Sequence, residues 1–215
     1  MKRLVLPRLY VILDAALLTV PETECAQKLV DAGVRLLQYR NKGASAHELF
    51  ECSKRISSLL VPQGVTFIVN DRADVAGAAE ASGIHIGQED LRAEAARSVI
   101  GTGKLLGVST HTLEQFKQAV ATSADYVAVG PVFSTSTKAY PNPVVGIEFI
   151  RRVRLLTDKP IVAIGGITLE RAVEVIQAGA DSAAVISDIL LAPEPGQRAR
   201  QYIGLLGAAN DAAAV

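Results

Sequence analysis

Two cationic side chains, Arg40 and Lys42, stand two residues apart in the segment Gln38–Lys42. If this segment is extended, both side chains point to the same side. A guanidinium offers a planar fork of N–H donors and an ammonium offers a point charge, so together they suit a polyanion. Lys138, much later in the chain, could supply a third cation. The alternative is that Arg40 and Lys42 are surface charges with acidic neighbours.

Two carboxylates, Asp71 and Asp90, each follow a short apolar run. Magnesium prefers a few carboxylates together with phosphate oxygens and water. Asp71 and Asp90 beside a cluster of cations therefore predict a Mg²⁺ site that assists binding of the polyanion. Either residue could instead cap the helix that follows it.

A second anion site is indicated by Gly165-Gly166-Ile167 and by Ile186-Ser187. A glycine turn beside a helix start can hold a phosphate monoester through backbone N–H groups. The glycines could also serve only a tight turn. One metal-assisted anion site and one metal-free site predict a transferase that brings two phosphorylated substrates together.

The histidines and cysteines indicate little chemistry. His47, His85 and His111 are scattered, so we expect no transition-metal site. His85 is expected in a strand and His47 on a helix surface, and the role of His111 is left open. Cys25 and Cys52 have no Cys-x-x-Cys spacing, and we expect reduced thiols in a cytosolic protein.

The elements that must position these residues alternate regularly between short β-branched runs and longer helix-like stretches. Most of the short runs are continuously apolar, as is typical of parallel strands covered on both faces. Eight such strands, each followed by a helix-sized segment, predict an α/β fold of one domain, the (β/α)₈ TIM barrel. We expect the barrel over residues 1–207 and a frayed tail over 208–215. The predicted strands are Leu9–Leu13, Leu36–Arg40, Thr66–Asn70, Ile84–Gly87, Leu105–Ser109, Tyr126–Val129, Ile161–Ile164 and Ala183–Ile186.

Helix signals separate the strands. Thr112–Thr122 places its apolar residues on one face, and a second helix is expected to start at Thr168 and stop at Gly179. A doubly wound open sheet is the main alternative. Its dinucleotide fingerprint is missing, because Gly101-Thr-Gly103 precedes a strand and Leu106 takes the place of the third glycine.

The composition favours small molecules as the partners of this protein. The chain has 215 residues, of which 49% are hydrophobic and 20% are charged. Lys plus Arg is 22 and Asp plus Glu is 22, so the formal net charge is 22 − 22 = 0. This balance does not favour nucleic acid or a membrane surface as a partner. The first apolar run is interrupted by Pro7 and Arg8 and closes on Asp14, unlike a signal peptide, so we expect a cytoplasmic protein.

Motifs along almost the whole chain resemble those of the thiamine-phosphate synthase family. The motifs occur in the family's order, and together they are highly specific. One departure is Asn41, where many family members carry an acidic residue. The motifs are Gln-Tyr-Arg-Asn-Lys (38–42), Val-Asn-Asp-Arg (69–72), Ile-His-Ile-Gly-Gln-Glu-Asp-Leu (84–91), Gly-Val-Ser-Thr-His-Thr (107–112), Val-Gly-Pro-Val-Phe (129–133), Thr-Ser-Thr-Lys (135–138), Ala-Ile-Gly-Gly-Ile (163–167) and Ala-Val-Ile-Ser (184–187).

The resemblance implies that hydroxymethylpyrimidine pyrophosphate reacts with hydroxyethylthiazole phosphate to give thiamine monophosphate and pyrophosphate. Pyrophosphate would leave first, with Mg²⁺ assistance, and the thiazole nitrogen would capture a pyrimidine-methyl cation. Asp71 and Asp90 would bind the metal, and Arg40, Lys42, Ser109 and Lys138 would act in catalysis. The pyrimidine pyrophosphate would contact Gln38, Tyr39, Arg40, Asn41, Lys42, Asn70, Ser109 and Lys138, and the thiazole phosphate would contact Thr135, Ser136, Thr137, Gly166, Ile186 and Ser187.

Three other functions are weighed against this one. A thiazole tautomerase of the same superfamily would lack the cations and carboxylates of the pyrophosphate site. A barrel of the indole-glycerol-phosphate type needs a Lys and Glu pair as acid and base, which no strand end supplies. A sensor that binds thiamine precursors without turnover would not need the charged rim. The sequence leaves open a homo-oligomer, a carboxylated thiazole substrate, the loop that closes over the site, and the role of Asp188.

Overall fold

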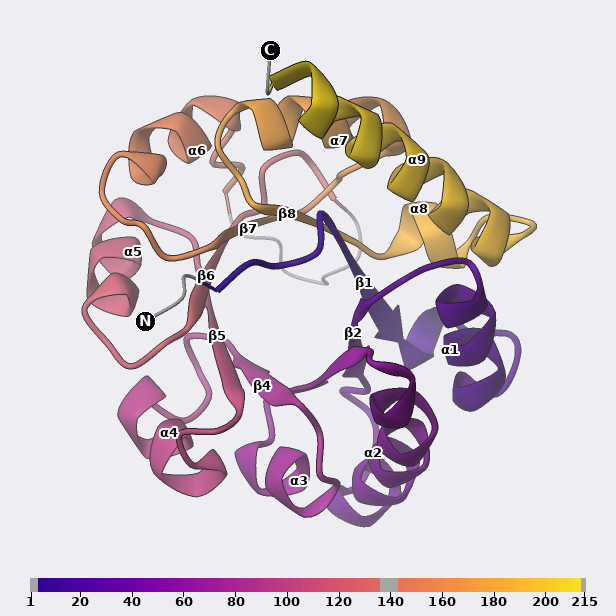
Figure 1. Cartoon of the computed structure of the whole chain (residues 1–215). Helices are drawn as coiled ribbons and strands as arrows, with labels where there is room; N and C mark the ends of the chain where they lie inside the picture. Colours follow the sequence, from indigo (N-terminus) through magenta and orange to yellow (C-terminus); the bar gives the residue numbers. More distant parts are fainter. Residues whose placement is uncertain (1–3, 136–142, 214–215) are drawn as a thin grey trace.

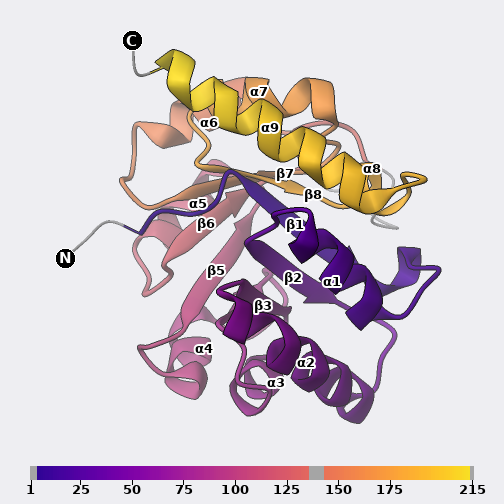
Figure 2. The ribbon, with the colours of Figure 1, turned by 45° about the vertical axis from the view of Figure 1, so that its right-hand side comes forward.

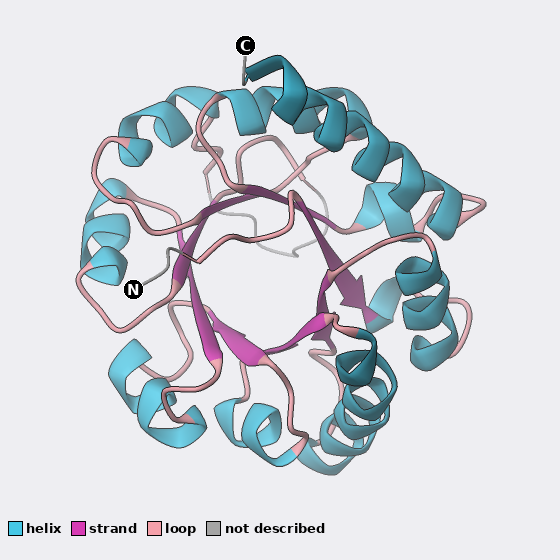
Figure 3. Ribbon diagram, in the orientation of Figure 1, coloured by secondary structure: helices cyan, strands magenta, loops and turns pink. Residues whose placement is uncertain are grey.

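The computed structural model describes residues 4–135 and 143–213, with side chains up to residue 208. Eight parallel strands form a closed barrel in sequence order, with β1 paired to β8. Helices surround the ring of strands on the outside (Figures 1 and 3). The strands are β1 (Leu9–Asp14), β2 (Leu36–Arg40), β3 (Thr66–Asn70), β4 (Gly83–Ile86), β5 (Leu105–Thr110), β6 (Tyr126–Val129), β7 (Ile161–Ile164) and β8 (Ser182–Val185).

The helices follow the strands as expected, with two short 3₁₀ turns added. Among the described residues, no helix has the length and apolar character needed to cross a bilayer. The helices are α1 (Glu22–Asp31), α2 (Ala46–Leu60), α3 (Ala73–Ala78), α4 (Ala93–Ile100), α5 (Leu113–Val120), α6 (Ile147–Arg154), α7 (Leu169–Gln177), α8 (Ser187–Leu190) and α9 (Pro195–Ala213), and the 3₁₀ turns are η1 (Ala15–Leu17) and η2 (Val61–Gln63).

The predicted (β/α)₈ fold is confirmed, and the predicted strand positions agree with the structure to within one residue at either end. Strands β4 and β8 begin one residue earlier than predicted, at Gly83 and Ser182, which are both buried. A Cβ at Gly83 would collide with the carbonyl of Leu105, so glycine permits the close approach of β5. These starts were missed because neither residue is an apolar β-former.

One helix-end prediction needs correction. Thr112 caps α5 through its hydroxyl, as predicted, but Thr168 makes no side-chain capping bond to α7. At the C-terminus, α9 spans Pro195–Ala213, and the frayed tail over residues 208–215 stays a prediction. Helix α9 lies along α1 and α7 (Figure 2), which explains why the helix is present so close to the end of the chain.

The core has two parts because each strand is buried on both faces. The larger part lies between the strands and the helices. The smaller part fills the barrel interior and contains Tyr10, Ile12, Leu36, Ile68 and Tyr126. Every second side chain along β1 and β2 points into the barrel. Asp14 follows Tyr10 and Ile12 in this alternation, and Arg40 follows Leu36 and Gln38, so both lie on the interior side at the carboxyl ends of their strands.

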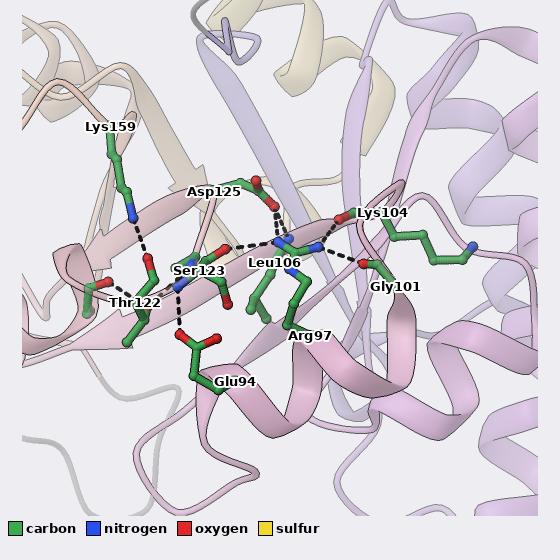
Figure 4. A network of polar contacts seen from close by, with 11 residues as sticks. Glu94, Arg97, Gly101, Lys104, Leu106, Thr122, Ser123, Asp125 and Lys159 are labelled. Carbon is green, nitrogen blue, oxygen red and sulfur yellow. Dashed lines mark hydrogen bonds and ion pairs between the residues drawn. The ribbon is translucent and has the colours of Figure 1, made fainter. Parts of the chain in front are cut away.

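A polar network joins the elements at the amino end of the barrel (Figure 4). Arg97 from α4 donates to Asp125 at 2.6 Å and to three backbone carbonyls. Asp125 also accepts the backbone N–H of Leu106 at 2.7 Å. Arg154 and Asp181 repeat this arrangement two βα units later, where Asp181 accepts from Ile161 N. Contacts at this end of a barrel serve stability, whereas the carboxyl end serves chemistry.

Candidate active site

Arg40 lies at the carboxyl end of β2, beside Asp14 of β1. The register places the two residues opposite one another, and their side chains form an ion pair. Asp14 is only 2% exposed and also accepts the backbone N–H of Ala16. The pair fixes the direction of the Arg40 guanidinium at the rim. Sequence reasoning treated Asp14 only as the end of an apolar run, although an acidic residue at a barrel strand end was a usable signal.

Lys42 turns toward the other neighbouring strand. Its ammonium forms an ion pair with Asp71, which follows β3. Arg40 and Lys42 therefore share the rim, but they diverge toward β1 and β3 and do not form a parallel pair. The alternative of acidic neighbours is correct in one respect, because both cations have carboxylate partners. Only Lys42 is exposed, with 57% of its side chain accessible against 19% for Arg40.

The carboxylates of Asp71 and Asp90 meet at the rim. Asp90 accepts the backbone N–H of Gly87 at 2.7 Å. Burial raises the pKa of Asp90, and the Asp71 carboxyl within hydrogen-bonding reach raises it further. Two carboxylates held this close are stabilised by a cation between or beside them. Neither acts as a helix cap, because Arg72 and Arg92 occupy the N-cap positions of α3 and α4.

The backbone of Asp71 is itself unusual, with a φ of 65°. This left-handed conformation is disfavoured for residues other than glycine, asparagine and aspartate. It is held by a hydrogen bond from Asp71 N to the carbonyl of His85 at 2.8 Å. The strained conformation turns the carboxylate away from the direction of β3, toward Lys42 and Asp90.

Three of the predicted pyrimidine-site residues lie on strands and differ in how deeply they are buried. Gln38 is buried in the barrel interior, and Ser109 and Asn70 are half-buried at the ends of β5 and β3. Ser109 Oγ lies 2.8 Å from His85 Nε2. His85 is therefore a strand residue, as expected, but it also contacts a predicted site residue, which the sequence did not indicate.

Tyr39 and Asn41 point away from Arg40, and their contact with the pyrophosphate stays a prediction. They line a separate cavity of about 520 Å³ outside the barrel, between the α1 and α2 elements. The Tyr39 hydroxyl donates to Glu22 and accepts from Asn41, both at 3.2 Å. Alternation of side chains along an extended segment predicts this different direction, because Tyr39 and Asn41 occupy the odd positions between Gln38, Arg40 and Lys42.

A second cavity, of about 340 Å³, opens at the ends of β7 and β8. Four of the predicted thiazole-phosphate residues line it: Thr135, Gly166, Ile186 and Ser187. The remaining predictions for this part of the rim, Ser136, Thr137 and Lys138, lie outside the described residues. The other lining residues are Ser134, Gly165, Ile167, Thr168, Arg171, Ala184, Asp188 and Leu191.

The glycine pair is required by both backbone conformation and space. Gly165 and Gly166 have φ values of 101° and 61°. A Cβ on Gly165 would collide with Pro131, and one on Gly166 would collide with the carbonyl oxygen of Ser134. The turn after β7 therefore lets the loop after β6 lie against it, and the two loops together form one wall of the cavity.

Arg171 is a cation that sequence reasoning missed. It lies on α7 and lines the same cavity. Its guanidinium carbon is 4.6 Å from the centroid of the Phe133 ring, and its Nη1 donates to the carbonyl of Gly166 at 2.9 Å. These contacts hold a positive charge at the wall of the cavity. The only sequence signal was a single arginine on a helix face, which normally indicates a surface charge.

Asp188 and His111, whose roles were left open, make structural contacts. Asp188 accepts from the hydroxyl of Tyr202 in α9 at 2.6 Å, which attaches that helix to the β8 end of the barrel. His111 Nδ1 is in hydrogen-bond contact with the carbonyl of Gly130. Within the described residues, no group of three or more His, Cys, Asp and Glu side chains forms a closed metal site.

Comparison with known proteins agrees with this geometry. Residues 9–189 match the family model described as thiamine monophosphate synthase. The chain is 49% identical over 208 residues to the thiamine-phosphate synthase of Koribacter versatilis (strain Ellin345), covering 94% of this chain and 96% of the relative. It is 41% identical to the enzyme of the same name from Chloroflexus aurantiacus, covering 96% and 95% of the two chains. A solved structure, thiamine phosphate pyrophosphorylase from Pyrococcus furiosus, superposes with a TM-score of 0.86 at 32% identity, covering 94% of this chain and 96% of that one.

Proposed function

This chain belongs to the thiamine monophosphate synthase family of alkyl-transferring enzymes, and from that premise we propose that it joins hydroxymethylpyrimidine pyrophosphate to hydroxyethylthiazole phosphate. The observation that supports the proposal is that two separate groups of residues suited to anions lie at one rim. One is the cluster of cations and carboxylates at β1–β4, and the other is the glycine-walled cavity at β7 and β8. Substrates bound at the two sites would meet across the mouth of the barrel.

The charged cluster suits a pyrophosphate with Mg²⁺. Asp71 and Asp90 would hold the metal, because their carboxylates converge, and burial together with the Asp71 carboxyl raises the pKa of Asp90. When bound, Mg²⁺ would neutralise charge that develops on the leaving pyrophosphate. Arg40, held by Asp14, would add a bidentate donor to the same oxygens. Lys42, whose side chain is exposed, would exchange its pairing with Asp71 for the pyrophosphate oxygens.

The glycine-walled cavity suits the thiazole phosphate. The Gly165–Gly166 turn and the hydroxyl-bearing residues Thr135 and Ser187 line its wall, and their N–H and O–H groups would donate to the phosphate. Arg171 supplies the charge that a phosphate dianion requires. No metal is needed at this site, because the phosphate is retained in the product and no charge develops on it.

The reaction proceeds in two bond changes. The bond between the pyrimidine methylene carbon and the pyrophosphate oxygen breaks, and its electron pair leaves with pyrophosphate. The thiazole nitrogen then uses its lone pair to form the new C–N bond. No general base is required, because that nitrogen carries no proton. The task of the site is therefore to stabilise the leaving group and to orient the two rings.

The direct test is pyrophosphate release from the purified protein, measured with both substrates, with each alone, and with Mg²⁺ replaced by a chelator. We expect release that requires both substrates and the metal, with thiamine monophosphate formed in equal amount. Restoring Mg²⁺ should restore the rate. Conversion of a thiazole isomer without pyrophosphate release would indicate the tautomerase activity, and binding without any turnover would indicate a sensor.

A further inference from the structure

A continuous chain of hydrogen bonds crosses the barrel interior directly beneath the rim. Gln38 Nε2 lies 2.7 Å from the Tyr10 hydroxyl, which lies 3.0 Å from the Tyr126 hydroxyl. Tyr126 is 3.1 Å from His85 Nδ1, and His85 Nε2 is 2.8 Å from Ser109 Oγ. Five strands contribute one residue each, so the chain connects the β2 side of the barrel to the β5 side. Ser109 is its only half-buried member, and the other four are buried.

The chain is built into the packing of the barrel. The Tyr126 ring occupies space next to Gly107, where any Cβ would collide with the ring and its hydroxyl. The His85 ring stacks on Tyr126 with centroids 5.6 Å apart, and Tyr10 meets Tyr126 edge to face at 6.2 Å. These contacts leave the hydroxyl and imidazole groups little freedom to choose other partners.

The direction of the hydrogen bonds follows from counting protons. Burial raises the pKa of both Tyr10 and Tyr126, so each keeps one proton to donate at neutral pH. Tyr10 accepts from the Gln38 amide, so its own proton goes to Tyr126, and the proton of Tyr126 goes to His85 Nδ1. The opposite direction would require the Gln38 amide to turn, so that its oxygen instead of its nitrogen faces the Tyr10 hydroxyl.

We propose that this chain holds His85 as the tautomer protonated on Nε2, so that Ser109 accepts from His85 and turns its own proton toward the mouth of the barrel. Ser109 then acts only as a hydrogen-bond donor to a bound anion. Given the proposed function, that anion is the leaving pyrophosphate, and Ser109 gives it a donor that is oriented before the substrate binds. His85, Tyr126, Tyr10 and Gln38 are positioning residues, because they act on the anion through Ser109.

The first test needs no substrate. With only three histidines in the chain, long-range ¹H–¹⁵N correlation spectra at pH 7.5 can report the tautomer of each ring. We expect His85 to be protonated on Nε2. His111 is an internal reference for the opposite tautomer, because its Nδ1 faces a carbonyl oxygen that can only accept. Protonation of His85 on Nδ1, or on both nitrogens, would overturn the proposal.

The substitution Gln38→Glu tests the direction of the chain from its far end. A carboxylate at position 38 can only accept from Tyr10, which reverses each bond as far as His85. We expect the His85 tautomer to change to Nδ1–H, although the substituted residue does not touch that ring. The spectra of His47 and His111 should stay the same. An unchanged His85 tautomer in a folded Gln38→Glu protein would show that the amide does not set the direction.

Enzyme kinetics test the effect on Ser109. In His85→Gln the side-chain amide nitrogen takes the place of Nε2 and can still donate to Ser109, whereas in His85→Asn the nitrogen takes the place of Nδ1. We expect His85→Asn to lower kcat by about 30-fold with an unchanged KM for the thiazole phosphate. His85→Gln should stay within about 5-fold of the parent, because it keeps the donor. Equal losses in the two variants would contradict a role through Ser109.

A double substitution separates positioning from packing. If His85 acts through Ser109, then His85→Asn should cost no further activity once Ser109→Ala is present. Additive losses would overturn the proposal.

The matched control is Thr110→Val. Thr110 lies in β5, as Ser109 does, and its buried hydroxyl donates to the carbonyl of Ala128, but it takes no part in the hydrogen bonds that link Gln38 to Ser109. The substitution should lower the thermal midpoint and leave kcat unchanged. If the parent protein releases no pyrophosphate, the proposed function fails, and the tautomer measurements still decide the inference about Ser109.

Discussion

At the scale of single residues, Arg40 and Lys42 each pair with a carboxylate at the rim, and the two pairs differ in burial. Asp14 is buried and keeps Arg40 in place, so that pair is a permanent part of the site. Lys42 and Asp71 form a more exposed pair, in which each partner could take a new one when substrate and metal arrive. Such a partner stabilises a charge at a partly buried rim, because burying an unpaired charge costs free energy.

The left-handed backbone of Asp71 provides the first prediction. Asparagine tolerates a φ of 65°, whereas alanine does not, so Asp71→Ala should be about 1 kcal/mol less stable than Asp71→Asn. Both variants should lose Mg²⁺-dependent pyrophosphate release, because both remove the carboxylate. Thermal unfolding and Mg²⁺ titration of the rate would measure the two effects separately.

Two results would contradict this interpretation. Normal magnesium dependence in Asp71→Asn would mean that the carboxylate is not a ligand. Equal stability of the two variants would mean that the backbone strain at this position is relieved by other means. Asp74→Asn is the matched control, because Asp74 is an exposed carboxylate on the adjacent helix that pairs only locally with Arg72.

At the scale of elements, the turn after β7 determines the shape of the thiazole-phosphate cavity. Its glycines allow two loops to touch, with Val132 N bonded to the carbonyl of Ile164 and Phe133 N bonded to that of Gly165. Arg171 of α7 then stacks on Phe133 and closes the wall. A cavity made from two loops and a helix depends on the space between them, so one added methyl group can change it.

Gly166→Ala should therefore raise the KM for the thiazole phosphate by roughly tenfold, because the new Cβ pushes the Ser134 carbonyl away from the cavity. Gly64→Ala is the matched control. Gly64 has a similar φ of 74° but no atom within 4 Å of the added Cβ. Both variants should lose about 1 kcal/mol of stability to backbone strain, and Gly166→Ala should lose more, because its Cβ also collides with the backbone of Ser134. A raised KM in Gly64→Ala, or an unchanged KM in Gly166→Ala, would show that space at the turn does not control binding.

At the scale of the whole molecule, the barrel separates stability from chemistry. The network of Arg97 and Asp125 joins α4, β5 and the start of β6 at the amino end (Figure 4). The proposed substrate sites lie at the carboxyl ends of the strands. Because the two ends share only the packed interior, damage at the amino end should lower stability without changing the substrate sites.

Asp125→Ala should accordingly lower the free energy of unfolding by about 2 kcal/mol, because Arg97 and the N–H of Leu106 both lose their acceptor. The kcat and KM values should be unchanged at temperatures where the variant is folded. Glu148→Ala breaks an exposed ion pair with Arg151 and should cost less than about 1 kcal/mol. Denaturant unfolding and steady-state kinetics on the same preparations would measure both. A fall in kcat for Asp125→Ala would mean that the two ends are coupled.

Much of the fold could be predicted from the chain because parallel barrel strands are buried on both faces. They appear as apolar runs such as Ile161–Ile164, and the segments between them carry helix signals such as Thr112. The polar residues that end these runs necessarily gather at one rim, since all eight strands point the same way. This is why the order of residues along the chain was enough to place Arg40, Asp71 and Ser109 at one rim.

The remaining features depend on which residues become neighbours across strands, and only the tertiary structure decides that. The closed register brings Asp14 beside Arg40, and the curvature of the sheet brings Tyr10, Tyr126 and His85 together in the interior. These residues are far apart in the chain, and each has an ordinary role when considered alone. The sequence by itself determined that eight strands would present polar ends at a common rim. Which of those groups pair, and in which direction their hydrogen bonds run, was decided by the closure of the barrel, because closure sets the distances between residues on different strands.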